Sequence, residues 1–232
     1  AYIPNYENVT DPINAIYAFQ TNGILQAGEA APAWQPAGAT MPGDPIFISK
    51  GNGKTALDSS DVVKYNGDPK ITIGFGNTFS YKNFDLSIFF YGQFGGWGYN
   101  YNTLWADPQG FLAGNQSGIE QIKKVWTTTN PSGTRPGVAY NEPALGLPAG
   151  TNLNLEKTDF LRCRNITLGY TFNSPGINKI FRNLNVYVDV QNPFIITNYK
   201  IGDPELEAVG KKGGPAPYPM ARTYSFGVKA SL

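Results

Sequence analysis

The chain ends with Arg222-Thr-Tyr-Ser-Phe-Gly-Val-Lys-Ala-Ser-Leu232, where apolar and polar side chains alternate without a break. Because successive side chains of a β-strand point to opposite faces, this stretch predicts a strand with one apolar and one polar face. A strand crosses a membrane with roughly 9–11 residues of this pattern, apolar side toward lipid and polar side toward the lumen. The edge strand of a soluble β-sandwich would look the same, so this stretch alone leaves both interpretations open.

Two further alternating runs predict a hairpin. Residues 71–82 and 84–94 each carry apolar side chains on one face, and the pair Lys82-Asn83 joins them. Long alternating runs around a two-residue turn are typical of a β-hairpin.

The rest of the chain contains weaker strand signals. Strands are predicted at 13–21, at 165–172 with a start near Phe160, and at 184–191. Arg162 and Arg164 fall on the apolar side of the second of these strands. We therefore expect them at the membrane edge, where long cationic side chains reach the polar interface.

The connections between the strands alternate in length. Lys82-Asn83 and 173–183 are short, whereas 26–70, 95–159 and 193–221 are long. Outer-membrane barrels have short periplasmic turns and long extracellular loops, and a soluble sandwich has no reason to sort its loops in this way. The pattern favours an all-β fold, namely an antiparallel transmembrane β-barrel segment of about six C-terminal strands with long extracellular loops. Since the smallest single-chain barrels have about eight strands, we expect more strands before Ala1.

Composition narrows the possible functions. The chain has no histidine and one cysteine, Cys163, which excludes histidine-based catalytic triads, an internal disulfide and a cysteine metal cluster. The net charge of +1 argues against a nucleic-acid surface. No signal peptide opens the chain, so we expect a processed chain or a fragment. We predict neither an enzyme nor a cofactor.

Several segments occur together in an order typical of one protein family. They read Ile16-Tyr-Ala-Phe-Gln-Thr-Asn-Gly-Ile24, Tyr65-Asn-Gly-Asp-Pro-Lys70, Ser80-Tyr-Lys-Asn-Phe-Asp-Leu-Ser-Ile-Phe-Phe-Tyr-Gly-Gln-Phe-Gly95, Asp159-Phe-Leu-Arg-Cys-Arg-Asn-Ile-Thr-Leu-Gly-Tyr-Thr-Phe172, Val186-Tyr-Val-Asp-Val-Gln-Asn192 and Tyr218-Pro-Met-Ala-Arg-Thr-Tyr-Ser-Phe-Gly-Val228. In these segments the chain resembles the C-terminal end of SusC/RagA-type TonB-linked outer-membrane transporters.

The resemblance implies a fold, partners and a location. It implies that residues 1–232 are the C-terminal part of a barrel of about 22 strands, whose N-terminal plug and TonB-binding segment lie elsewhere. It also implies import of glycans or peptides under a SusD-like surface lipoprotein that closes as a lid. The location implied is the Gram-negative outer membrane, in contact with lipid, with the C-terminus in the periplasm. These residues alone are not expected to transport anything.

One loop departs from the family pattern. The family often carries an Asp-x-Asn-Gly-Asp-Gly loop that resembles a calcium site, whereas this chain has Ser49-Lys-Gly-Asn-Gly-Lys54. Calcium prefers six to eight oxygen ligands that include carboxylates, and lysines supply none. Asp58 and Asp61 lie nearby, but we expect no metal.

Two groups of residues are candidate contact sites. Aromatic rings can stack on sugars or anchor a protein interface, but Trp and Tyr also form belts at membrane surfaces, and both interpretations of the aromatic group stay open. The second group should face the lumen, either contacting substrate or plug or forming a solvated wall. The aromatic group is Trp97, Tyr99, Tyr101 and Trp105; the lumen-facing group is Asp85, Tyr187, Asp189, Gln191 and Lys229.

Two loop features complete the prediction. Ser117-Gly-Ile-Glu120 is a capping box that predicts a short helix to about Trp126. Asp203, Glu205 and Glu207 are expected to form a mobile acidic loop. Two alternatives remain: a soluble all-β glycan-binding module that uses the aromatic loop, and a histidine-free glycoside hydrolase that uses these carboxylates.

Overall fold

The structure is a computed structural model, and it describes residues 10–35, 40–51, 53–100, 123–137, 151–176, 180–200, 202–207 and 218–231. The chain divides into two compact units, which we describe separately. The sheet unit comprises Pro69–Gly96, Lys157–Leu206 and Pro217–Leu232. The loop unit comprises Ala1–Asp68, Trp97–Glu156 and Glu207–Ala216.

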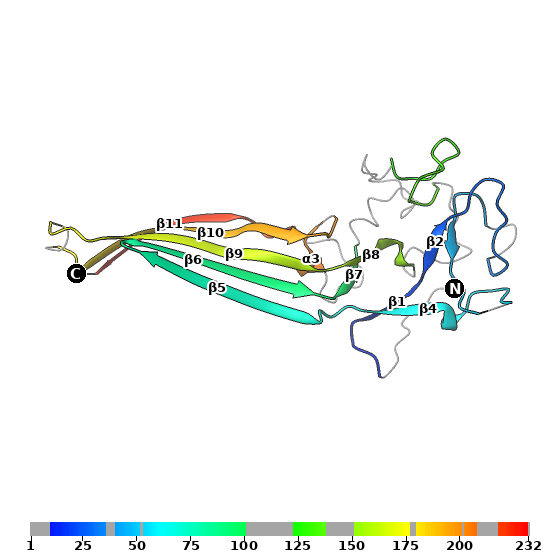
Figure 1. Cartoon of the computed structure of the whole chain (residues 1–232), viewed down its shortest axis with the longest axis horizontal. Helices are drawn as coiled ribbons and strands as arrows, with labels where there is room; N and C mark the ends of the chain where they lie inside the picture. Colours follow the sequence, from blue (N-terminus) through cyan, green and yellow to red (C-terminus); the bar gives the residue numbers. More distant parts are fainter. Residues whose placement is uncertain are drawn as a thin grey trace. The chain divides into compact units, whose positions relative to one another are not determined.

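The sheet unit is built on five long strands, each antiparallel to its neighbours (Figure 1). The strands are β5 (Ile71–Tyr81), β6 (Phe84–Phe94), β9 (Phe160–Phe172), β10 (Asn183–Thr197) and β11 (Thr223–Ser231), and their order in the sheet is β11-β10-β9-β6-β5. The predicted hairpin is confirmed: Tyr81 pairs with Phe84, so Lys82 and Asn83 form the turn. Lys82 has a φ of 54°, in the left-handed region that such tight turns require.

The antiparallel order gives the sheet two different ends. Both short connections, Lys82-Asn83 and the link from β9 to β10, lie at one end, which we call the turn end. The long connections leave from the opposite end, the loop end. The sorting of connections that the sequence predicts is therefore present in the structure.

The register aligns the alternation of all the strands, so the sheet has an apolar face and a polar face. Leu86, Leu168, Val188 and Phe226 lie in one cross-strand row, and Asp85, Gly169, Tyr187 and Gly227 lie in the next. Side chains of the apolar face are exposed, with Phe226 at 80% and Val228 at 67%. An uncovered apolar face of this extent marks contact with lipid or another protein.

The position of the two arginines differs from the prediction because β9 contains a bulge. Asn165 pairs with Phe89, but Cys163 pairs with the next residue of β6, so Arg164 is an extra residue in β9. A bulge of this kind reverses the phase of the alternation. Arg162 consequently pairs with Tyr91 and lies on the polar face. The expectation that Arg162 lies on the apolar side at the membrane edge is wrong.

Strand β10 is longer than predicted. The sequence suggests an end at Gln191, before Asn192-Pro193, whereas the strand continues to Thr197. The register with β9 shifts between Gln191 and Phe194, and Asn192 has a φ of 50°. Proline is tolerated inside a sheet at such irregularities, because the ladder hydrogen bond that it lacks is already interrupted there.

In the part of the loop unit that the structure describes, the strands are short. They are β1 (Ala15–Phe19), β2 (Thr21–Ile24), β3 (Pro45–Phe47), β4 (Val62–Asn66), β7 (Trp97–Tyr99) and β8 (Leu155–Lys157), with single turns of 3₁₀ helix η1 (Ser59–Asp61) and η3 (Asn152–Asn154). They pair two by two, as β1 with β4, β2 with β3, and β7 with β8. Phe19 and Phe47 form a small core with Leu57 and Val62.

The strand pairing corrects the expected number of strands in the long sheet and shows how far the sheet extends. The predicted strand 13–21 is β1 and the start of β2, and it pairs outside the long sheet, so the long sheet has five strands rather than about six. Within the described residues this sheet ends at β11 and β5 and does not close on itself. None of the helices in the described segments has the length and apolar character of a membrane-spanning helix.

Candidate functional site: the polar face of the sheet

The register places the five predicted lumen residues on one face. Asp85 and Tyr187 share a row, and Asp189 and Gln191 follow Tyr187 at alternate positions of β10. Lys229 of β11 pairs with Asn185, two residues before Tyr187. Asp85 and Gln191 are exposed, whereas Asp189 is buried. The five residues share one face of the sheet, and that this face lines a lumen stays a prediction.

Asp189 is the centre of a polar network on this face. Its carboxylate accepts a hydrogen bond from the Thr167 hydroxyl at 2.6 Å and another from the Asn165 side-chain amide. Both donors lie on the neighbouring strand β9: Thr167 pairs with Asp189 itself, and Asn165 pairs with Gln191, the next residue on the same face. Buried carboxylates need such partners, because an unsatisfied one is costly. The network holds the Asp189 side chain against strand β9.

Tyr187 lies flat against the neighbouring strand. A methyl group at position 227 would overlap its ring, so the glycine of β11 is what allows the ring to lie there. The Lys229 ammonium is 5.0 Å from the centre of the same ring, within the range of a cation–π interaction. Tyr187 and Lys229 thus form a pair, while Asp85 receives a 2.6 Å hydrogen bond from Ser80.

The loop end of this face carries a cluster of charges with a buried central pair, which we call the arginine cluster: Arg162, Arg164, Asp203 and Glu205. The Arg162 Nη2 donates to both oxygens of Asp203, at 2.6 and 2.7 Å, and its Nε donates to Glu205 at 3.0 Å. Arg164 donates to the other oxygen of Glu205. Arg162 and Asp203 are 3% and 4% exposed.

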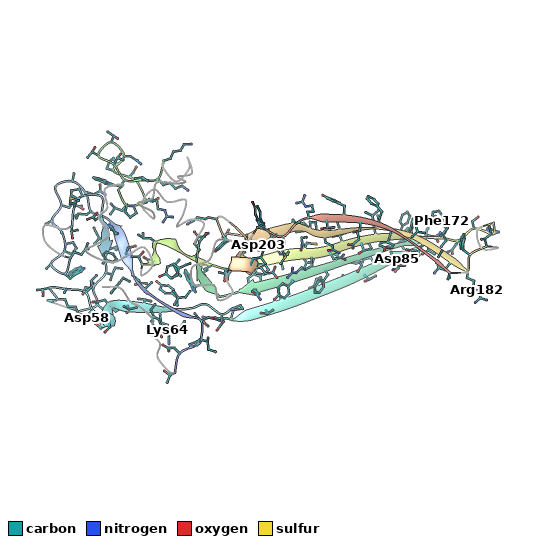
Figure 2. The ribbon with its side chains drawn as sticks, turned by 180° about the vertical axis from the view of Figure 1, so that it is seen from behind. Asp58, Lys64, Asp85, Phe172, Arg182 and Asp203 are labelled. Carbon is teal, nitrogen blue, oxygen red and sulfur yellow. The ribbon has the colours of Figure 1, made fainter. Side chains whose placement is uncertain are left out.

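The arginine cluster holds the last long connection against the sheet. Asp203 precedes the short helix α3 (Pro204–Glu207), and its carboxylate also accepts bonds from the Glu205 and Met220 amides. Asp203 lies at the loop end and Arg182 and Phe172 at the turn end, as Figure 2 shows. The prediction of a mobile acidic loop is therefore wrong for Asp203 and Glu205. A carboxylate with both oxygens bound by one guanidinium is also a poor catalytic acid or base, which argues against the hydrolase alternative.

Comparison with known proteins finds similar sequences and similar structures. No family model matches the chain. SusC of Bacteroides thetaiotaomicron is 32% identical over 198 residues, which cover 79% of this chain and 17% of SusC. TonB-dependent receptor P3 of Formosa agariphila is 26% identical over 234 residues, 94% of this chain and 22% of the receptor. The structure of the RagAB peptide transporter aligns with a TM-score of 0.71 and 21% identity, covering 93% of this chain and 22% of that chain.

The chain belongs to the SusC/RagA family of TonB-dependent receptors. It spans about a fifth of the length of the curated relatives named above, and its fold is that of part of the RagA barrel. TonB-dependent receptors sit in the outer membrane and are transporters rather than enzymes. The recognition made from the ordered sequence segments is confirmed.

Half of the aromatic group lies in the described part of this SusC/RagA-family chain. Trp97 and Tyr99 belong to β7, which pairs with β8, and the Trp97 ring packs edge-on against Tyr65 at 5.1 Å. Tyr101 and Trp105 lie outside the described residues. A role in ligand, lid or membrane contact stays a prediction for these residues.

The loop that departs from the family pattern is closed by a lysine. The Lys54 ammonium contacts Asp58 and Asp61 at 3.0 Å each and the Ser60 hydroxyl at 2.6 Å. Asp61 is buried and also accepts hydrogen bonds from the Lys50 and Asp58 amides. In the described residues, no three carboxylate, histidine or cysteine side chains come together as a metal site. We call this group the lysine cluster.

Charge and hydrogen bonding shift the pKa values in the lysine cluster. Hydrogen bonds from Ser60 and Lys54 lower the pKa of Asp58 to about 2. Burial alone would raise the pKa of Asp61, but the backbone amides of Asp58 and Lys50, together with Lys54, outweigh it and lower the pKa. The hydrogen bond to Asp58 raises the pKa of Lys54. All three groups are therefore charged near neutral pH.

The predicted helix in the long loop is not seen where it can be checked. Residues 117–122 lie outside the described residues, and Lys123 and Lys124 form a turn. Val125 is in an isolated bridge with Arg135, and Trp126 donates from its indole to Gln26. The helix therefore does not extend to Trp126. Gly43 lies against the Trp126 ring and Gly133 against the Trp126 backbone, so a Cβ at either position would overlap Trp126.

Proposed function

We propose that this chain forms part of the barrel wall of an outer-membrane, TonB-dependent importer of oligosaccharides or peptides. The observation that carries the proposal is the long sheet itself, with an exposed apolar face opposite a hydrogen-bonded polar face. Lipid is the natural contact of the first face and the aqueous lumen that of the second. The family membership of the chain supports the same conclusion.

The proposed topology follows from the two ends of the sheet. The turn end and the C-terminus face the periplasm, and the long connections of the loop end reach the cell exterior. Residues 1–232 then form the C-terminal part of the barrel domain. The plug and the segment that binds TonB belong to other parts of the full-length protein, and energy for import enters through them.

The polar face supplies the residues that would line the lumen. Asp85 and Gln191 are exposed and available to substrate or plug, whereas Asp189 holds its place through Asn165 and Thr167. Trp97 and Tyr99, with Tyr101 and Trp105, would contact the ligand or the lid from the extracellular side. None of these residues is assigned a chemical step, because the process is transport.

The names of the relatives motivate the proposed substrate and partner. RagAB is described as a peptide transporter. SusC, at 32% identity, is a TonB-dependent receptor. We propose that the full-length protein works with a SusD-like surface lipoprotein, which closes over the barrel as a lid. The soluble glycan-binding alternative would need a layer of chain over the apolar face, and the described residues of the sheet unit supply none.

Uptake by intact cells tests the proposal. Cells that lack the gene are complemented with the full-length protein, and uptake of labelled oligosaccharides and peptides is measured. We expect one class to be imported only with the gene present and only with active TonB. Uptake that persists without TonB, or that does not need the gene, would contradict the proposal.

A matched pair of variants tests the assignment of the faces. Asp189→Ala alters the polar face and Val188→Ala alters its neighbour on the apolar face. If the polar face lines the lumen, Asp189→Ala changes the uptake rate or KM while Val188→Ala does not, at equal amounts of folded protein. An equal effect of both variants would argue for a general folding defect.

Epitope insertion tests the orientation. A tag after Gly176, in the short turn between β9 and β10, should be hidden from antibody in intact cells. A tag after Ser132, in an exposed part of a long connection, should be accessible. The reverse result would invert the proposed topology.

A further inference from the structure

The apolar face contains a hollow of about 500 Å³ near the turn end. It is lined by Val186, Val188 and the glycines at 169 and 227, together with larger side chains that include Phe84, Tyr170 and Phe226. Phe84 and Tyr170 pack edge to face at 4.8 Å on one side, and Phe226 stands on the other. The hollow exists because short side chains in the middle strands lie between bulky ones.

The hollow remains open to the membrane side of the sheet. Val188 and Leu168 are 38% and 46% exposed although they lie in the middle strands. A further strand paired with β11 would extend the sheet sideways, because strands join edge to edge about 4.8 Å apart. It would add to the rim of the hollow and would not cover it.

Basic side chains lie at the same end of the sheet as the hollow. Lys82 is in the turn next to Phe84, and its ammonium is 5.3 Å from the ring centre of Tyr81, which belongs to the apolar face. Arg182 immediately precedes β10, and its amide donates to Ser231 of β11. Both side chains are exposed. Neither cation lines the hollow itself, but both lie at the turn end of the sheet that carries it. An apolar hollow with cations at the same end of the sheet suits an acyl chain with an anionic headgroup.

We infer that this hollow is a binding site for one anionic phospholipid, whose acyl chain lies between Phe84 and Phe226 and whose phosphate meets Lys82 and Arg182. The inference rests on the proposed function only in placing the apolar face in lipid, and it does not depend on what is transported. The lipid would be held by shape and charge, in contrast to the lipids that slide past the rest of the face.

Native mass spectrometry of the full-length protein in mild detergent tests the site, with phosphatidylglycerol as the anionic probe and phosphatidylcholine as the neutral one. We expect one tightly retained phosphatidylglycerol. Val188→Trp fills the hollow and should weaken retention about tenfold, whereas Val190→Trp adds the same bulk to the same strand and face outside the hollow and should leave it unchanged. Lys82→Gln and Arg182→Gln should each weaken phosphatidylglycerol about fivefold and leave phosphatidylcholine unaffected.

The outcomes separate the possible occupants and keep folding defects apart from lost binding. If Val188→Trp does not fold, Val186→Leu makes a smaller change in the same hollow. Equal lipid retention in the Val188 and Val190 variants, or no preference for the anionic lipid, would overturn the proposal. A lipid-free dimer that Val188→Trp dissociates would overturn it in favour of contact between copies. The readout involves no transport, so its failure is distinct from failure of the proposed function.

Discussion

The arginine cluster of the sheet unit and the lysine cluster of the loop unit both fix a loop with opposite charges, yet they differ in reach. Arg162 binds Asp203 and Glu205, which lie 41 and 43 residues further along the chain. Lys54 binds Asp58 and Asp61, 4 and 7 residues away. The first cluster joins distant segments and its central pair is buried, whereas the second closes a single loop and is partly exposed. The difference predicts global consequences for one cluster and local ones for the other.

Replacement of Arg162 should lower the free energy of unfolding more than replacement of Arg164 or Lys54. In Arg162→Met, Asp203 stays buried without its bidentate partner, and loss of one member of a buried ion pair costs about 3–5 kcal/mol. Urea unfolding of the full-length protein in detergent measures the loss. The double variant Arg162→Met with Asp203→Leu removes both charges and should recover part of it. A single variant as stable as the wild type would show that the cluster does not hold the loop.

Replacement of Arg164 should lower the free energy of unfolding, measured by the same urea unfolding, by less than replacement of Arg162. Arg164 is 28% exposed at its side chain, and Glu205 retains Arg162 as a partner when Arg164 is replaced. Its ring contact with Tyr91, at 5.1 Å, is also lost in Arg164→Gln. We expect a destabilisation of about 1 kcal/mol. A loss as large as that of Arg162→Met would mean that the cluster cannot be divided into a central pair and a supporting arginine.

Removal of Lys54 should affect only its own loop. In Lys54→Met, the carboxylates of Asp58 and Asp61 face each other without the cation, and the loop should open to proteases between residues 49 and 61. The urea midpoint of the full-length protein should not move. Lys50→Met is the matched control, because the Lys50 ammonium bonds only the Val62 carbonyl among the contacts described. A changed urea midpoint would contradict the local role.

The same contrast between distant and local contacts along the chain explains which features the sequence could and could not predict. Alternation with a period of two is a property of the strand backbone, so β5, β6 and β11 and the five residues of the polar face were predictable. The bulge at Arg164 reverses that alternation, and the amino-acid sequence alone does not show where the reversal occurs. The one available signal was charge: two arginines on the wrong side of β9 and an acidic group in a later loop.

The loop unit was less predictable for a related physical reason. Its strands have three to five residues, too few to establish a period, and they are ordered by contacts far along the chain. Trp126, for example, donates a hydrogen bond from its indole to Gln26, 100 residues away, and lies in no helix. By contrast, the lysine cluster is local, and Lys54, one of the two lysines that argued against a metal, closes the loop.

Acid should open the lysine cluster in a defined pH range. The pKa of Asp58 falls from its ordinary value of 3.8 to about 2 on folding, and the pKa of Asp61 also falls. A carboxylate with a lowered pKa stabilises the fold at pH values above its unfolded pKa, and this contribution disappears as the pH drops through the folded pKa. Hydrogen-exchange protection of the Lys50 and Ser60 amides, which bond Asp61 and Asp58, should therefore be constant above pH 4 and decline between about pH 4 and pH 2. In Lys54→Met the pKa values of both carboxylates should rise, so the decline should begin at higher pH. Protection that is unchanged by Lys54→Met across this range would show that the backbone turn, and not the charge of Lys54, holds the loop.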